Sequence, residues 1–141
     1  MSVISFNTIH LEQNMGHGKD VDIPFFSVAM CVYGKDNPDW FDKALCSVID
    51  QTVQPDEIVL VVDGPIPDSI QNVIDKYSKI CAEGIGLDNL TKMITFQVVY
   101  LKENQGLGKA LRKAVATCRY EIIARMDSDD IAVRNRFELQ L

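Results

Sequence analysis

Several features that would place this 141-residue chain in a familiar class are missing from its sequence. It has no apolar run of the length that a membrane span needs, and its formal net charge of −6 argues against a nucleic-acid-binding surface. Its four cysteines include no C-x-x-C pair, so we expect neither disulfides nor a zinc site but reduced core thiols. These absences indicate a cytoplasmic globular protein without a nucleic-acid partner.

The first 24 residues also lack a basic start and a continuous apolar stretch, so they do not have the features of a signal peptide. We interpret residues 1–24 as a polar lead-in that need not be ordered. Residues 25–141 are long enough and apolar enough to form one domain of ordinary size.

From residue 24 onward, short β-branched runs alternate with segments of helical period. This alternation predicts an α/β fold with a mainly parallel sheet. Strands are expected over residues 25–33, 57–64, 94–101 and 121–127. The first of these runs is nearly all apolar, which is typical of a strand covered on both faces.

Helices are predicted between these strands from apolar residues at helical spacing. Asn37 is expected to cap the first helix with Pro38 in its first turn, and Asp68 or Ser69 to cap the second. The apolar stripe of the first helix, expected to face the core, comprises Trp40, Phe41, Ala44, Leu45, Val48 and Ile49. The stripe of the third comprises Leu107, Ala110, Leu111, Ala114, Val115 and Cys118.

Polar residues stand at the carboxyl ends of the predicted strands. They are Tyr33 after the first strand, Asp63 after the second, and Asp127, Asp129 and Asp130 after the fourth. In open parallel sheets ligands bind outside these ends, near the place where the strand order reverses. With right-handed crossovers, a strand order of 3-2-1-4 would bring all of them to one rim of the sheet.

The three carboxylates in "RMDSDD" call for a cation or a solvated loop, because like charges this close repel. Along an extended segment Asp127 and Asp129 would share one side, whereas Asp130 faces differently or begins a turn. Carboxylate oxygens suit Mg²⁺ or Mn²⁺, which bridge to substrate phosphates and would let an acidic protein hold a diphosphate. The alternative is that the carboxylates only cap a helix starting near Val133. Asp63 has a similar alternative as part of an ordinary Asp-Gly turn.

The segment "NQGLGKA" has features of a phosphate-binding loop. A P-loop is excluded because Ala110 stands where Ser or Thr is needed. Gly106 and Gly108 fit the first two glycines of a dinucleotide fingerprint, with Asp127 about 20 residues further on, but Leu111 occupies the third small position. A Rossmann-type NAD-binding oxidoreductase fragment therefore remains an alternative, as does a non-catalytic α/β interaction module.

Four passages in order resemble the family 2 glycosyltransferases, inverting enzymes of the GT-A fold. "FSVAMCVYGKD" is similar to the family's opening strand and tyrosine loop, and "LCSVIDQTVQPDEIVLVVDGP" to its helix, Gln-Thr turn and second strand ending in aspartate. "NQGLGKAL" is similar to its Asn-x-Gly loop, and "RMDSDDIAVRNRFELQL" to its Asp-x-Asp metal motif and following helix. The resemblance runs from about Phe26 to Leu141.

The resemblance implies a role for each residue that matches a family motif. Tyr33 and Asp63 would contact the nucleoside, and Asp127 is assigned to the nucleotide as well. Asp129 and Asp130 are assigned to a Mn²⁺ or Mg²⁺ ion, although which carboxylate ligates the metal directly stays open. The metal would act as a Lewis acid and offset the charge that develops on the departing nucleoside diphosphate.

The chain also departs from the family pattern. Val62 stands where many members carry a second acidic residue, and Leu111 and Arg112 replace an Arg-Asn pair, so contacts at these positions are in doubt. Family members continue to an acceptor half that supplies the catalytic base, so the base is expected beyond Leu141 and the fold is expected to be truncated before that half.

From the resemblance we expect sugar transfer, with inversion, from a nucleoside-diphosphate sugar to an acceptor hydroxyl in surface polysaccharide synthesis. A UDP-sugar is the favoured donor, and the acceptor would be a glycan or a lipid-linked molecule. This chain is expected to bind the donor without efficient transfer, in the cytoplasm and at the inner face of the membrane. An exposed apolar face is expected to favour a homodimer.

Overall fold

The structure of the protein, a computed structural model, describes residues 23–84 and 92–141. The predicted lead-in up to residue 22, and most of the loop predicted after the second helix, lie outside the described residues. The elements follow in the predicted alternation: β1 (Phe26–Val32), α1 (Pro38–Ile49), β2 (Glu57–Asp63), α2 (Asp68–Glu83), β3 (Thr95–Leu101), α3 (Leu107–Thr117), β4 (Ile122–Met126) and α4 (Arg136–Gln140).

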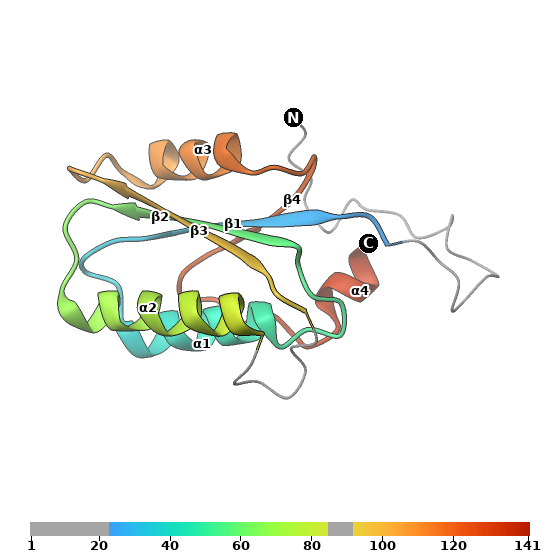
Figure 1. Ribbon diagram of the computed structural model, residues 1–141. Coiled ribbons are helices and arrows are strands. Elements are labelled where there is room, and N and C mark those ends of the chain that lie inside the picture. Colours follow the sequence, from blue (N-terminus) through green and yellow to red (C-terminus); the bar gives the residue numbers. More distant parts are fainter. Residues whose placement is uncertain (1–22, 85–91) are drawn as a thin grey trace.

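The described strands form one parallel sheet in the order β3-β2-β1-β4, which confirms the predicted order. Met30 in β1 pairs with Leu60 in β2 and with Met126 in β4, so β1 lies at the centre. Figure 1 shows α1 and α2 on one face of the sheet and α3 on the other. The strand order reverses between β1 and β4, which is the place where α/β sheets bind ligands.

The two central strands form the core of the protein. Every residue of β1 and β2 is buried, which confirms the prediction that β1 is covered on both faces, whereas β3 at the edge is only partly buried. Phe26 at the start of β1 contacts Phe137 of α4 edge-to-face with ring centroids 5.1 Å apart. All four cysteines are free thiols, and Cys31, Cys81 and Cys118 are buried, which agrees with the prediction of reduced core thiols.

Helix α1 begins as predicted. The Asn37 side chain accepts hydrogen bonds from the backbone N–H groups of Asp39 (2.9 Å) and Trp40 (3.1 Å), and Pro38 occupies the first turn. The prediction that Trp40 packs in the core is wrong, because its side chain is 56% exposed. The buried residues of the helix begin at Phe41. The apolar pattern of the sequence therefore includes one residue, Trp40, that does not pack against the sheet.

Helix α2 begins at Asp68 without a side-chain cap, so the prediction that Asp68 or Ser69 caps it is wrong. The preceding Pro67 carbonyl accepts the N–H groups of Ile70 and Gln71, both at 3.1 Å. At its other end the helix stops at Gly84, whose φ of 67° is the left-handed conformation that glycine adopts freely. The end of the helix therefore lies at the predicted loop.

Helix α3 packs on the other face of the sheet through Ala110 and Ala114, which lie against the buried side of β1 and β2. Leu107 shares the same sequence periodicity, but its side chain is 64% exposed because it stands at the first position of the helix, beyond the sheet. Within the described residues, no helix has both the length and the apolar character needed to cross a membrane.

Candidate functional site

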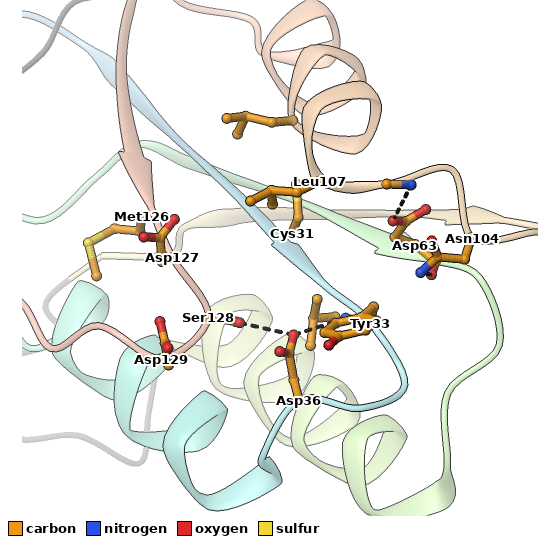
Figure 2. Close-up of a pocket in the computed structure, with 13 residues that line it drawn as sticks. Cys31, Tyr33, Asp36, Asp63, Asn104, Leu107, Met126, Asp127, Ser128 and Asp129 are labelled. Atoms are coloured by element: carbon orange, nitrogen blue, oxygen red, sulfur yellow. Dashed lines mark hydrogen bonds between the residues drawn. The ribbon is translucent and has the colours of Figure 1, made fainter.

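A pocket of about 460 Å³ opens at the carboxyl ends of the strands (Figure 2). Of the five predicted site residues, Tyr33, Asp63, Asp127 and Asp129 line the pocket, whereas Asp130 does not. The other lining residues are Cys31, Val32, Asp36, Asn104, Gly106, Leu107, Leu111, Met126 and Ser128. The predicted rim therefore exists, although any contact of these residues with a ligand remains a prediction.

The segment after β1, residues 33–37, is called here the Tyr33 loop. The Asp36 N–H donates to the Tyr33 carbonyl (3.1 Å), and the Tyr33 N–H donates back to Asp36 Oδ2 (3.0 Å), so the turn is closed from both sides. Gly34 allows the loop to approach its neighbour, since a Cβ there would lie 2.7 Å from the Pro65 carbonyl oxygen. The Tyr33 ring remains 40% exposed at the pocket.

Asp63 ends β2 and is only 5% exposed. Its Oδ1 accepts the Gln105 N–H at 2.7 Å and its Oδ2 accepts the Gly106 N–H at 3.1 Å. The neighbouring Gly64 has a φ of 90°, and a Cβ on it would lie 2.7 Å from the Asn104 nitrogen. Asp63 and Gly64 therefore do more than form a turn, because they hold the loop before α3 against the end of β2.

The residues Asp127–Asp130 form a segment called here the carboxylate turn. The Asp130 N–H donates to the Asp127 carbonyl at 3.2 Å, and oxygens of Asp127, Asp129 and Asp130 all lie within 4.8 Å of one another. The oxygens of Asp127 and Asp129 converge as expected, but through a turn and not through side-chain alternation along an extended segment, because β4 ends at Met126. That turn also brings Asp130 into the cluster.

Charge is concentrated at this turn. Burial raises the pKa of Asp127, and the neighbouring charges of Asp130 and Asp129 raise it further, while Arg125 opposes the shift. Three converging carboxylates are the oxygen donors that hard divalent cations prefer. A Mg²⁺ or Mn²⁺ ion fits this donor set and would relieve the repulsion that raises the pKa of Asp127.

The alternative interpretation, that the carboxylates cap a helix starting near Val133, is wrong. Helix α4 begins only at Arg136. Before it, the Ala132 N–H donates to Ser47 Oγ (2.9 Å), and Gln51 Nε2 donates to the Val133 carbonyl (2.7 Å). The Phe137 N–H also donates to Gln51 Oε1 (3.2 Å), so Gln51 binds both groups of the Val133–Phe137 hydrogen bond with which a helix from Val133 would begin.

Sequence reasoning missed three polar residues of the pocket, namely Asp36, Asn104 and Ser128. The Ser128 hydroxyl donates to Asp36 Oδ2 at 3.0 Å across 92 positions of the chain (Figure 2). No local pattern signals a contact over that separation. Cys31 was predicted only as a core thiol, yet it lines the pocket, where burial and the nearby Asp63 carboxylate raise its pKa to about 11.

The lining of the pocket combines acidic and apolar side chains. Leu107 and Leu111 of α3 are apolar, as is Met126, which lies beside Asp127 in Figure 2. Within the described part of the chain, the lining includes four aspartates and no Lys, Arg or His. An anionic ligand would therefore meet a repulsive field unless a cation entered with it.

The dinucleotide-binding alternative is not supported by the topology. In that fold the glycine-rich turn follows the central first strand beside the reversal of strand order, where the helix N-terminus receives the pyrophosphate. Here the turn with Gly106 and Gly108 follows β3, an edge strand on the far side of β2 from that reversal.

Comparison with known proteins decides between the remaining interpretations. The chain matches the family described as "Glycosyl transferase family 2" over residues 27–141. The chain belongs to glycosyl transferase family 2. This confirms the resemblance found in the sequence, and the parallel sheet with flanking helices confirms the predicted α/β, GT-A-like fold class.

Two curated family 2 relatives show the extent of the likeness. The "Amylovoran biosynthesis glycosyltransferase AmsE" of Erwinia amylovora is 38% identical over 116 residues, which covers 82% of this chain and 39% of the relative. The "UDP-Gal:alpha-D-GlcNAc-diphosphoundecaprenol beta-1,3-galactosyltransferase" of Escherichia coli is 36% identical over 117 residues, covering 83% and 38%. The chain therefore spans well under half the length of these relatives.

Solved structures share the family 2 fold. The crystal structure of S. aureus TarS 1-349 superimposes with a TM-score of 0.60 at 25% identity, covering 82% of this chain and 30% of that one. The same protein in complex with UDP gives a TM-score of 0.62 at 23% identity, with the same coverage.

Proposed function

We propose that residues 25–141 form the nucleotide-sugar-binding part of a glycosyltransferase that transfers a sugar from a nucleoside diphosphate to an acceptor hydroxyl. Membership of family 2 supports the reaction class. The relatives' names support a role in polysaccharide synthesis and a UDP-linked donor, since one is an amylovoran biosynthesis enzyme and another uses UDP-Gal.

The acidic pocket is the observation that carries this proposal. Four aspartates line it, and three carboxylates converge within 4.8 Å at one side. A diphosphate would be repelled by the pocket alone but attracted once Mn²⁺ or Mg²⁺ is bound at the carboxylate turn. When bound, the ion would supply Lewis-acid stabilisation of the leaving nucleoside diphosphate.

The residues of the pocket suggest how the donor is oriented. The exposed face of the Tyr33 ring offers a stacking surface for the base. Asp63 and Asp127 are proposed to contact the nucleotide, and Asp129 and Asp130 to bind the cation. This assignment places the nucleoside beside the ends of β1 and β2 and the diphosphate at the end of β4.

The remaining steps are proposals about the whole transfer reaction. Transfer with inversion needs a general base at the acceptor hydroxyl, and no residue of this chain is assigned to that role. The chain itself is expected to bind the donor without efficient transfer. A glycan or lipid-linked acceptor, action in the cytoplasm at the inner face of the membrane, and a homodimer are further proposals that await measurement.

Calorimetric titration of UDP into the 141-residue chain tests the donor site directly. We expect tight binding in the presence of Mn²⁺, much weaker binding with chelator, and a similar weakening in Asp129→Ala. A matched control is Glu83→Ala, which removes an exposed carboxylate at the end of α2, away from the pocket, and should bind like the unaltered chain. Binding that is indifferent to Mn²⁺ and to Asp129→Ala would contradict the proposal.

A further inference from the structure

We propose that Asp36 is a positioning residue that couples nucleoside binding to cation binding by tying the Tyr33 loop to the carboxylate turn through Ser128. The inference rests on the proposed function, because it concerns two halves of the same donor site. Neither Asp36 nor Ser128 is needed as a direct ligand for the coupling to operate.

The geometry begins with a single oxygen atom. Asp36 Oδ2 accepts the Tyr33 N–H at 3.0 Å and the Ser128 hydroxyl at 3.0 Å (Figure 2). The Asp36 N–H also donates to the Tyr33 carbonyl, so the backbone that carries this carboxylate is fixed by the same turn. Hydrogen bonds to an ionised carboxylate are about twice as strong as neutral ones, which suits a link between two loops.

The link lies where the sheet no longer holds the two segments together. β1 and β4 are neighbours, and their last paired residues are Met30 and Met126. Beyond those residues β1 pairs only with β2 up to Val32 before the Tyr33 loop begins, while β4 ends and the carboxylate turn follows. The Asp36–Ser128 hydrogen bond therefore joins the two segments beyond the reach of the strand pairing.

The position of Ser128 makes the link effective. Ser128 stands between Asp127 and Asp129, so a shift of its hydroxyl displaces carboxylates on both sides of it. On the other side, the Tyr33 loop is braced at Gly34, which lies against the Pro65 carbonyl. A movement of the carboxylate turn, as on cation binding, therefore shifts Asp36 and with it the position of the Tyr33 loop, because the loop is held at Gly34.

Asp36 acts by position and not as a ligand of the cation. The carboxylate oxygens that converge closely enough to hold one ion come from Asp127, Asp129 and Asp130, and Asp36 is outside this group. Its charge nonetheless lies in the pocket lining, where it helps to raise the pKa of Cys31. Substitutions that keep its hydrogen bonds should therefore preserve the coupling even without the charge.

The test measures a coupling factor, the affinity for UDP with Mn²⁺ divided by the affinity without it, in the 141-residue chain. Asp36→Ala and Ser128→Ala are each expected to lower this factor about tenfold. A change of that size corresponds to the free energy of one hydrogen bond to a charged group. Asp36→Asn should restore most of it, because one amide oxygen can accept both bonds. The double Ala variant should lose no more than Asp36→Ala alone.

If Asp36 were a ligand of the ion, Asp36→Ala would weaken the binding of Mn²⁺ alone, whereas a positioning residue leaves that affinity unchanged. Titration of Mn²⁺ alone, followed by electron paramagnetic resonance, should give nearly the same affinity in Asp36→Ala as in the unaltered chain. Thermal unfolding of each variant identifies any that fail to fold, and Ser128→Ala, which removes only a hydroxyl, keeps the test decisive in that case.

Three results would overturn the inference: an unchanged coupling factor in Ser128→Ala, additive losses in the double variant, or no rescue by Asp36→Asn. The proposed function can fail separately. If the unaltered chain does not bind UDP with Mn²⁺, both fail, whereas normal binding with unchanged coupling in the variants refutes the positioning role alone.

Discussion

The buried carboxylate of Asp63 accepts a hydrogen bond from the backbone N–H of Gly106, 43 positions along the chain, at 3.1 Å. Its other oxygen accepts the Gln105 N–H at 2.7 Å. Gly106 adopts φ 94° and ψ 156°, a conformation that is essentially restricted to glycine. Asp63 therefore holds a strained loop in place, whatever contact it also makes with a ligand.

Replacing Asp63 by Asn tests this structural role. The Asn side chain offers one acceptor oxygen, and its NH₂ group would face a backbone N–H, so one of the two bonds is lost. We expect the free energy of unfolding in urea to fall by about 2 kcal/mol, the value of a hydrogen bond to a charged group. Asp68→Asn, at an exposed position without a capping bond, should change it little. Equal stability of the two variants would contradict the role.

Substitution by alanine should have opposite effects on stability at Gly106, which precedes α3, and at Gly108, in its first turn. Gly106→Ala is expected to lower the free energy of unfolding by about 1–3 kcal/mol because of its backbone conformation alone, since a Cβ there meets nothing within 4 Å. Gly108→Ala, in the first turn of α3, should raise it by up to about 1 kcal/mol. Chemical denaturation of both variants provides the measurement, and destabilisation of equal size in the two would contradict the backbone explanation.

The carboxylate turn should destabilise the metal-free protein at neutral pH. Burial and the charges of Asp130 and Asp129 raise the pKa of Asp127 above its ordinary value of 3.8, so the folded state binds more protons than the unfolded state above that pH. The contribution of Asp127 to stability is therefore fully present below the ordinary pKa and is lost as the pH rises through the raised one. We expect Asp127→Asn to raise the melting temperature at pH 7.

The pH dependence and the metal provide the controls for Asp127→Asn. Near pH 3 the unaltered chain is already protonated at this position, so the difference in melting temperature should vanish. Added Mn²⁺ should stabilise the unaltered chain much more than the variant. A variant that is less stable than the unaltered chain at pH 7 without metal would show that the Asp127 charge has a favourable partner.

Gln51 should be sensitive to replacement because it holds the segment after the carboxylate turn. It is 1% exposed, its Nε2 donates to the Val133 carbonyl at 2.7 Å, and its Oε1 accepts the Phe137 N–H at 3.2 Å. Gln51→Glu removes the donor and buries a charge, so we expect a loss of about 3 kcal/mol in the free energy of unfolding. Gln71→Glu, at a less buried position on α2, should cost far less.

Most of the fold could be predicted because it follows from local patterns. The apolar run of β1 predicted a strand covered on both faces, and with right-handed crossovers the order 3-2-1-4 was the one that brings the polar strand ends to one rim. The failures lie where tertiary contacts override a local pattern. The helix expected near Val133 starts at Arg136, and Gln51 binds the Val133 carbonyl and the Phe137 N–H that would pair in the earlier turn.

The site was predictable to the extent that it follows the strand ends. Tyr33, Asp63 and Asp127 come together because the carboxyl ends of parallel strands share one rim. Asp36 and Ser128 could not be found in the same way, because their contact depends on how two loops lean toward each other. Asp-rich turns and serines are common in loops, so neither residue has a sequence signature of its own.

The pairing of β1 with β4 also sets the order in which the pocket can form during folding. Phe26 pairs with Ile122 and Met30 with Met126, contacts that close nearly the whole described chain, whereas β1 and β2 are much nearer in sequence. Closing so long a segment is the slow step in a folding reaction. The donor pocket should thus be among the last features to form during folding. A bound nucleotide would therefore lower the rate of unfolding and leave the rate of folding nearly unchanged.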